Sequence, residues 1–563
     1  MPGSNRETDE AWRYHDATKH SYESVRSGPH ALDWANQPRP FKIYRGLEPI
    51  PLPRELPRPG VPAVEAAAGL VAPASMDAIP DLPTLACVLF LSAGITKRKR
   101  YPGGEIAFRA ASCTGALYEI DLYVICGDLE GLRAGVYHFD PAGFALYRLR
   151  DGDYRGALAE ATSHEPSVAR APVTIVCTGT YWRNAWKYRA RTYRHFGWDN
   201  GTILANLLAA ASAFRLPARI VCGFVDEAIN RLLGLETERE VAFSTVALGR
   251  AGEPPPPAPA IEPLALEVVP PSRSEIDYPI VRRMHAASSL ASPAEVAAWR
   301  EGARALRAEL EALAAEQAER ARGARIPLPV PARSAVPRDS LEDVILRRGS
   351  TRQFDRGASW TPGQLAVALA CATAPLAADF LGAGGPPPPA AAASPADSPA
   401  ADVAAESGEP SGPFASGGGV RLNDLYLIVH AVDGLEPGAY VLSRRGLELE
   451  LLRRGRFRAE AGYLGLEQDL PADGSVVVFF LADLHRVLRH LGNRGYRSAQ
   501  LEAGILGGRL YLAAYAQRLG ASGLTFYDDD VVEFFSPHAA GKSAIFCIVL
   551  GRSVKRERRS GAR

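Results

Sequence analysis

The strongest constraint on this chain is an internal repeat with a constant shift of about 300 residues. The triplet D-L-Y occurs from Asp121 to Tyr123 and again from Asp424 to Tyr426, a shift of 303 (424 − 121 = 303). A period of this length exceeds the repeat unit of solenoids and propellers, so it predicts two domain-sized copies. Further matches at the same shift join Gly131, Leu132, Gly135 and Tyr137 to Gly434, Leu435, Gly438 and Tyr440.

A basic aromatic segment is also repeated. The first copy reads W-K-Y-R-A-R-T-Y-R over Trp186 to Arg194, before an apolar, helix-like run from Ile203 to Phe214. This density of Arg, Lys and Tyr is one that a solvated face rarely needs, and its recurrence supports the duplication. Three of its residues recur in the second copy, where Arg191, Tyr193 and Arg194 become Arg494, Tyr496 and Arg497.

Composition limits the class of protein. The chain has 563 residues, 47% of them hydrophobic and 23% charged, with a net charge of +1. This is typical of a globular chain of two to four domains and gives no reason to expect nucleic-acid or membrane-surface binding. Seven isolated cysteines and no C-x-x-C indicate buried thiols in a reducing compartment. With no apolar leader-like run, we expect a cytoplasmic location.

The pattern divides the chain into four parts. Residues 1–80 alternate short patterned pieces with Pro-rich ones and predict an extended arm. Residues 81–250 form the first domain and begin with a helix from Leu82 to Ala93. A Pro-rich linker and an amphipathic helix beginning near Ser292 occupy residues 251–335, and that helix should pack on a neighbour. Residues 336–556 form the second domain, whose Pro/Ala/Ser-rich insertion at 382–419 is predicted to be disordered.

The order of elements favours an α+β fold in two layers. Long helices are mixed with short β runs, without a regular β-α-β-α alternation. The chain has no G-x-G-x-x-G after a strand, no P-loop motif and no H-E-x-x-H. A Rossmann domain, a P-loop and a zincin are each unsupported, and we assign no metal ligands.

The second copy opens with a motif suited to phosphate. In R-R-G-S-T-R, Arg348, Ser350 and Arg352 would supply two guanidinium groups and a hydroxyl at one point. The alternative is a basic helix end that complements its dipole. The first copy has no counterpart, because Arg45 and Leu47 stand 303 residues before Arg348 and Ser350.

The first copy has two features that the second lacks. In R-A-A-S-C-T-G-A-L-Y, the small residues Ser112, Thr114 and Gly115 would let the backbone approach a flat ligand, although a tight turn needs the same residues. Lys187 beside Tyr188 could provide a catalytic base, or could be a surface charge beside a half-buried ring. The second copy has His490 and Leu491 at the latter positions.

Taken together, these motifs resemble the FMN-dependent nitroreductase superfamily, and more narrowly its SagB/ThcOx branch of azoline dehydrogenases. R-R-G-S-T-R-Q-F is similar to the R-x-S-x-R flavin-phosphate motif, and R-A-A-S-C-T-G-A-L-Y from Arg109 resembles R-x-P-S-x-G-A-L-Y, with Ala111 where Pro is usual. The segment from Trp186 resembles the one that holds the branch's Lys-Tyr catalytic pair. The terminal L-G-R, ending at Arg552, is similar to the family's phosphate-closing arginine.

The resemblance implies two tandem nitroreductase-like FMN-binding domains that form an intramolecular pseudo-dimer. Each copy keeps half of the parts, so one composite site with one FMN per chain is expected. Lys187 and Tyr188 would be catalytic, and an amide of the Gly520–Thr525 stretch would lie near the flavin ring. The implied cofactor-binding residues are Arg109, Ser112, Thr114, Gly115, Arg348, Ser350, Arg352, Gly523 and Arg552.

The implied function is an FMN-dependent dehydrogenase of the azoline-oxidising type. Its substrate would be a peptide or related small molecule, with partners from natural-product biosynthesis and neither nucleic acid nor membrane. One alternative is an NAD(P)H-dependent nitro or quinone reductase. Another is a non-catalytic flavin-binding or scaffold subunit.

Overall fold

The computed structural model describes residues 5–27, 30–74, 76–101, 104–320, 325–329, 334, 336–382 and 418–554. The insertion predicted at 382–419 lies outside these residues, apart from its two ends. Over the described ranges, none of the helices combines the length and the apolar character that crossing a membrane requires.

Two seven-stranded antiparallel sheets with matching strand orders form the framework. Two of their inner strands, β7 (Val173–Thr180) and β14 (Val476–Ala482), are buried along their whole length, as a continuous β-branched run such as Val173–Cys177 predicts. The first sheet is ordered β1 (Pro49–Pro51), β6 (Ala145–Asp151), β5 (Gly135–Asp140), β4 (Ile120–Cys126), β7 (Val173–Thr180), β9 (Glu240–Leu248), β8 (Ala218–Val221). The second is ordered β10 (Arg325–Pro327), β13 (Glu448–Arg454), β12 (Gly438–Leu442), β11 (Asn423–Val429), β14 (Val476–Ala482), β16 (Ser543–Gly551), β15 (Gly520–Leu524).

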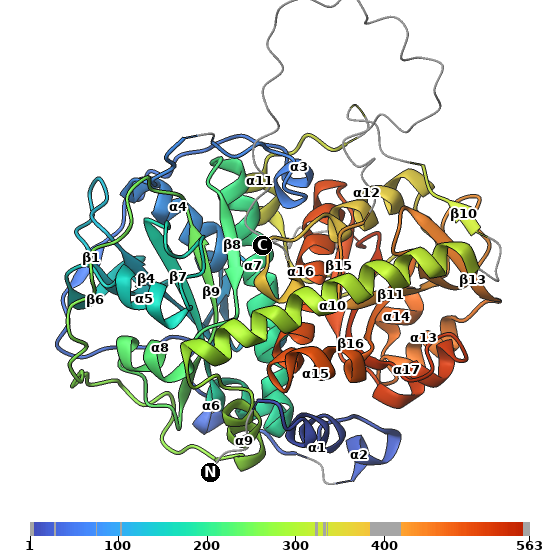
Figure 1. Ribbon diagram of the computed structural model, residues 1–563. Helices are drawn as coiled ribbons and strands as arrows, with labels where there is room; N and C mark the ends of the chain where they lie inside the picture. The colour runs from blue at the N-terminus through green and yellow to red at the C-terminus, as the bar shows by residue number, and fades with distance from the viewer. Residues whose placement is uncertain are drawn as a thin grey trace, which may run out of the picture.

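Each sheet is the centre of one half of the molecule, and Figure 1 shows the halves side by side. We call residues 30–250 the first half and residues 325–554 the second half. The mixture of antiparallel sheets and covering helices confirms the α+β class. A separate hairpin, β2 (Ile95–Tyr101) and β3 (Gly104–Arg109), extends from the first half. The shorter helices are α3 (Ala63–Ala67), α4 (Leu82–Ala93), α5 (Arg155–Ala161), α6 (Tyr181–Tyr188), α8 (Asp226–Leu233), α9 (Pro279–Ala287), α11 (Leu341–Arg347), α12 (Pro362–Thr373), α13 (Arg458–Leu464), α14 (Asp469–Asp473), α15 (Leu484–Leu491) and α17 (Asp528–Phe535).

Two long buried helices join the halves at the centre of the molecule. They are α7 (Thr192–Ala213) and α16 (Arg494–Ala516). A Cβ placed on Gly201 would lie 2.6 Å from the backbone of Gly504, so only glycine allows the two helices to approach this closely. The helix predicted over Ile203–Phe214 is part of α7, which begins about three turns earlier, inside the basic aromatic segment.

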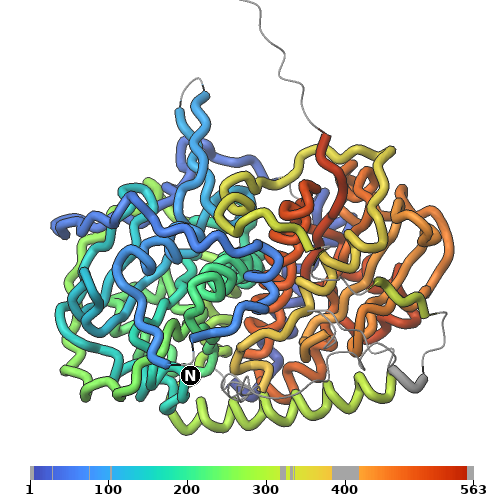
Figure 2. Tube along the Cα trace, turned by 90° about the horizontal axis from the view of Figure 1, so that it is seen from above, coloured from blue at the N-terminus to red at the C-terminus, as the bar shows by residue number. Residues whose placement is uncertain are grey.

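The helix α10 (Pro293–Arg320) crosses both halves, as Figures 1 and 2 show. Its Arg300 donates to the carbonyl oxygen of Ser163 in the first half at 3.3 Å. Its Glu309 accepts from Arg486 Nε at 2.9 Å and from Arg489 in the second half. The predicted packing is confirmed, because the apolar stripe is buried at Val296, Trp299, Ala303, Leu306 and Leu310.

The prediction of an extended arm over residues 1–80 needs correction. The described residues of the arm contain three α-helices, α1 (Asp9–Ala17), α2 (Tyr22–Arg26) and α3, and they also supply β1 to the first sheet. Tyr14 of α1 is fully buried and donates to the carbonyl oxygen of Ala190 at 2.6 Å. The prolines near residue 50 are consistent with an arm. The packing of α1 could not be predicted locally, because its contacts are with residues far away in the sequence.

Candidate functional site

The phosphate-type motif of the second half lies against the small-residue loop of the first half. Arg348 directly follows α11. Its Nε donates to the carbonyl oxygen of Ala110 at 2.8 Å, and its Nη2 is 3.3 Å from that of Arg109. In the part of the chain that the structure describes, the guanidinium has no carboxylate partner. Two motifs about 240 residues apart in the sequence therefore meet at one place.

Tyr511 of α16 organises the rest of this motif. Its hydroxyl lies 3.2 Å from Ser350 Oγ and accepts the backbone N–H of Gly523 at 2.7 Å. The guanidinium of Arg348 lies 5.6 Å from the centre of the same ring. The amide of Gly523 thus donates to a side chain of its own half.

Two exposed arginines accompany the motif. Arg352 follows Ser350, and Arg552 follows β16. A β-bridge between Phe354 and Ser553 places the two segments side by side, and Arg552 accepts the N–H of Asp355 through its carbonyl oxygen at 2.8 Å. Neither guanidinium forms an ion pair with a described residue. This edge therefore presents uncompensated positive charge.

The loop of the first half is held by its own network. Arg109 is buried, and its guanidinium donates to the carbonyl oxygens of Ile120 and Pro40, so this arginine supports the loop from the inside. Ser112 accepts from Thr202 Oγ1 through its carbonyl oxygen at 2.7 Å. The N–H and the hydroxyl of Thr114 both donate to Asp199, each at 2.9 Å.

Gly115 brings this loop against the Lys-Tyr pair. It is exposed, has a φ of +64°, and a Cβ placed on it would lie 2.9 Å from the hydroxyl of Tyr188. Both requirements favour glycine. The predicted loop and the predicted catalytic pair are therefore neighbours.

Lys187 and Tyr188 end the helix α6, and their proton affinities are shifted in opposite directions. Burial lowers the pKa of Lys187, and the charge of Arg352 lowers it further. Burial raises the pKa of Tyr188, with further contributions from Asp199 and Cys113. The amine is thus the easier group to use as a base, whereas the phenol retains its proton. Arg352 of the second half is thus near enough to Lys187 to affect its pKa.

The repeated arginines form buried ion pairs, a role that the sequence analysis did not assign. Arg191 and Arg194 are buried and bind Asp528 at 3.0 and 2.6 Å. Arg494 and Arg497 bind Asp226 at 2.6 and 2.9 Å. Each pair thus binds a carboxylate of the opposite half. The aspartates were detectable in the sequence, because Phe224 and Asp226 match Phe526 and Asp528 at a shift of 302 (528 − 226 = 302).

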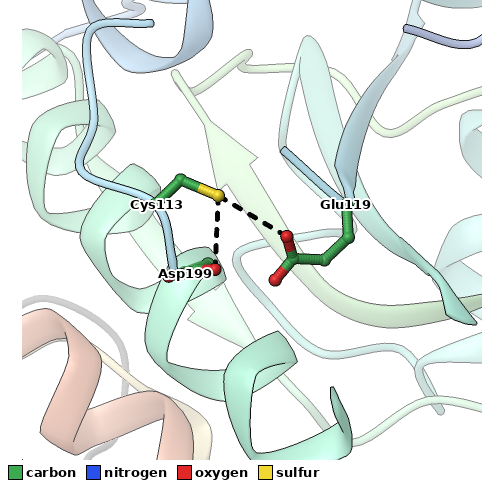
Figure 3. Close-up of side chains that lie close together, drawn as sticks. All are labelled: Cys113, Glu119 and Asp199. Atoms are coloured by element: carbon green, nitrogen blue, oxygen red, sulfur yellow. Dashed lines mark hydrogen bonds between the residues drawn. The ribbon is translucent and has the colours of Figure 1, made fainter. Parts of the chain in front are cut away.

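A buried acidic cluster beneath the loop is absent from the sequence interpretation. Figure 3 shows Cys113, Glu119 and Asp199 converging from the loop, the start of β4 and α7. Cys113 Sγ lies 3.3 Å from Asp199 Oδ2 and 3.5 Å from Glu119 Oε2. Their sequence separations give no ligand spacing, so only the fold brings them together.

Comparison with known proteins bears on the fold of the chain. Residues 91–250 match the Nitroreductase family. A Methanocaldococcus jannaschii protein, provisionally named a nitroreductase, is 26% identical over 155 residues, which are 28% of this chain and 75% of that protein. The crystal structure of a protein from Anabaena variabilis, also provisionally named a nitroreductase, has a TM-score of 0.70 and 24% identity, covering 97% of this chain and 99% of the other. The chain thus shares its fold with that protein over nearly its whole length.

Proposed function

We propose that the protein is an FMN-dependent oxidoreductase whose two nitroreductase-like halves form a pseudo-dimer with one composite flavin site. The observation that carries the proposal is the contact of Arg348 with the carbonyl oxygens of Arg109 and Ala110. Because of this contact, the phosphate-type motif of the second half and the small-residue loop of the first half belong to a single site.

The residues present suit the phosphate of FMN. Arg352 and Arg552 are exposed cations without ion-pair partners among the described residues, and Ser350 adds an exposed hydroxyl. Arg348 donates only to neutral oxygens, so it can contribute its charge as well. Guanidinium groups pair well with phosphate because their planar N–H donors match its oxygens.

The first half would supply the contacts to the flavin ring and the acid–base chemistry. Ser112, Thr114 and Gly115 are partly or fully exposed, and Gly115 borders Tyr188. FMN, when bound, takes two electrons from a substrate or passes them on. Lys187, with its lowered pKa, would accept a proton from the substrate, and the protonated Tyr188 would donate a hydrogen bond.

Two reaction types compete for this site. A dehydrogenase acting on azoline rings of a peptide, with natural-product biosynthesis partners, is supported by the Lys-Tyr pair, because such an oxidation needs a base. A nitro or quinone reductase that uses NAD(P)H is supported by the family match over residues 91–250. A non-catalytic flavin-binding subunit would not need the opposite pKa shifts of Lys187 and Tyr188.

Flavin content and anaerobic reduction test the proposal. The purified protein is denatured, and the released flavin is quantified against protein. One FMN per chain is expected, because only one phosphate-type motif is present; two per chain, or none after reconstitution, contradicts the composite site. The holoprotein is then mixed anaerobically with NAD(P)H or with a peptide containing a thiazoline. Bleaching of the flavin by the peptide alone identifies a dehydrogenase, and bleaching by NAD(P)H alone identifies a reductase.

A further inference from the structure

The cluster of Cys113, Glu119 and Asp199 offers three ligand atoms at metal-site spacing. All three ligand atoms lie within 4.8 Å of one another, and Glu119 and Asp199 are buried. Zinc binds thiolate at about 2.3 Å and carboxylate at about 2.0 Å, so tetrahedral angles place sulfur and oxygen about 3.5 Å apart. The observed Sγ–Oδ2 and Sγ–Oε2 distances are 3.3 and 3.5 Å. Both sulfur–oxygen distances are therefore close to those of a tetrahedral zinc site.

The ligand atoms are held in place by surrounding donors. The N–H of Thr114 and its hydroxyl donate to Asp199, and the N–H of Tyr118 donates to Cys113 Sγ at 3.1 Å. Each carboxylate oxygen has two lone pairs, so one remains for a metal after the hydrogen bond. Outer hydrogen bonds of this kind orient ligands in protein metal sites.

The two carboxylates of the cluster have no ion-pair partner among the described residues. Glu119 is 0% exposed, and its Oε1 has no hydrogen-bond partner. Over the described ranges, neither Glu119 nor Asp199 forms an ion pair with lysine or arginine. A buried carboxylate without a partner is costly unless a cation or a proton neutralises it. Cys113 and Asp199 also line a cavity of about 10 Å³, which is room for roughly one water as a fourth ligand.

We propose that Cys113, Glu119 and Asp199 bind one divalent cation of the zinc type. One thiolate with two carboxylates suits a tetrahedral, borderline-soft ion better than magnesium or calcium, which prefer oxygen ligands alone. Binding replaces the thiol proton, which is released to solvent. Because the ligands come from the loop, the start of β4 and α7, the ion would fasten the loop at Thr114 and Gly115 to the central helix. This proposal does not depend on the flavin.

Elemental analysis of untagged protein purified without chelators provides the test. The wild type should contain about one zinc or other divalent ion per chain, either as purified or after incubation with Zn²⁺ and gel filtration. Cys113→Ser and Asp199→Asn should each reduce the content by at least about tenfold, because each removes a ligand. Cys126→Ser is the matched control: it removes another buried thiol in β4, outside the cluster, and should keep the metal.

Cobalt replacement adds a readout of the thiolate itself. Co²⁺ in the wild type should give red-region bands, which lie outside flavin absorption, with the intensity of tetrahedral coordination. Cys113→Ser should abolish the thiolate charge-transfer band. If Cys113→Ser fails to fold, Glu119→Gln keeps the thiol and should still weaken binding. The proposal is overturned if the wild type binds neither Zn²⁺ nor Co²⁺, in which case a shared proton neutralises the cluster. It is equally overturned if Cys113→Ser binds metal as well as the wild type does.

Discussion

The central arginines form equivalent ion pairs in the two halves, whereas the motifs of the candidate site differ between the halves. Asp528 accepts from Arg191, Arg194 and the N–H of His20, at 3.0, 2.6 and 2.8 Å. Asp226 accepts from Arg494, Arg497 and the N–H of Leu290, at 2.6, 2.9 and 2.9 Å. We call these two reciprocal groups the aspartate clamps.

The contrast separates two kinds of constraint. Each aspartate clamp joins one half to the other, and a change on either side would leave a buried charge without a partner. Among the described residues, those of the candidate site form no such reciprocal contacts. The two halves also differ at these positions: Arg45 stands 303 residues before Arg348, and His490 stands 303 residues after Lys187. The two halves therefore have equivalent residues in the aspartate clamps, which join them. They differ in the residues of the candidate site, where a single composite site would need each group only once.

The largest expected effect concerns the Lys-Tyr pair. Lys187→Ala should lower turnover about 10²–10⁴-fold while FMN content is retained, because the variant lacks the proposed base but keeps the phosphate contacts. The matched control is His490→Ala, at the equivalent position in the second half, where the side chain pairs with Glu309. Turnover should survive that change. Loss of flavin from Lys187→Ala would instead assign the lysine a structural role.

The aspartate clamps should respond equally in the two halves. Asp528→Asn and Asp226→Asn each leave two buried arginines without a carboxylate, and each should cost about 3–5 kcal/mol of the free energy of unfolding. Urea unfolding followed by fluorescence and circular dichroism measures both. Costs that differ by more than about 2 kcal/mol would show that the symmetry of the clamps is geometric and not energetic.

The same clamps predict a direction of pH dependence. Burial alone would raise the pKa of Asp528, but Arg191 and Arg194 outweigh it and hold that pKa well below its usual range. A carboxylate with a depressed pKa stabilises the fold above its unfolded value of about 3.9, and this contribution is lost as the pH falls towards the folded pKa. Asp528→Asn should therefore flatten the loss of stability below about pH 4.

Substitutions in the phosphate-type motif should weaken FMN binding, and only those in the second half should do so. Arg348→Ala should weaken FMN binding by about 1.5–3 kcal/mol, or about ten- to a hundred-fold, as expected for a lost charged hydrogen bond. Arg45→Ala is the control at the equivalent position, where an exposed arginine pairs with Glu267. Titration of the deflavinated variants with FMN gives both affinities. Equal losses in the two variants would mean that the first half also holds a phosphate.

The smallest effect tests the contact between α7 and α16. Gly201→Ala places a methyl group 2.6 Å from the backbone of Gly504, so the helices must separate, at a cost of about 1–3 kcal/mol. Gly446→Ala, which meets nothing within 4 Å, should be nearly neutral. Thermal unfolding of the two variants measures the difference. A neutral Gly201→Ala would mean that the helices can shift apart freely.

Local sequence patterns predicted the elements better than they predicted the site. The helix over Leu82–Ala93 has the predicted bounds, because an apolar run after an Asp N-cap and an early proline specifies both ends locally. The apolar stripe of α10 was equally readable from its spacing. The ion pairs of Arg191 and Arg194 could not be predicted from local spacing, because their partner Asp528 lies more than 330 residues away.

The candidate site shows the same limit at single residues. Motif resemblance selected Arg109 and Gly523, and their roles towards a flavin stay predictions. In the structure the guanidinium of Arg109 donates to backbone carbonyls, and the amide of Gly523 donates to Tyr511. Conversely, no sequence spacing pointed to Cys113, Glu119 and Asp199 as a group. Which polar groups remain available to a ligand depends on hydrogen bonds that form only after folding.

The helix α10, which contacts both halves, has a consequence for mass action. Two separate subunits stay together only above a protein concentration set by their dissociation constant, whereas halves on one chain face each other at a fixed effective concentration. The contact between α7 and α16 should therefore resist dilution, and unfolding should not depend on protein concentration if the chain is monomeric. In a dimer of identical subunits, every substitution appears twice. Here a substitution appears once, so each half can change alone.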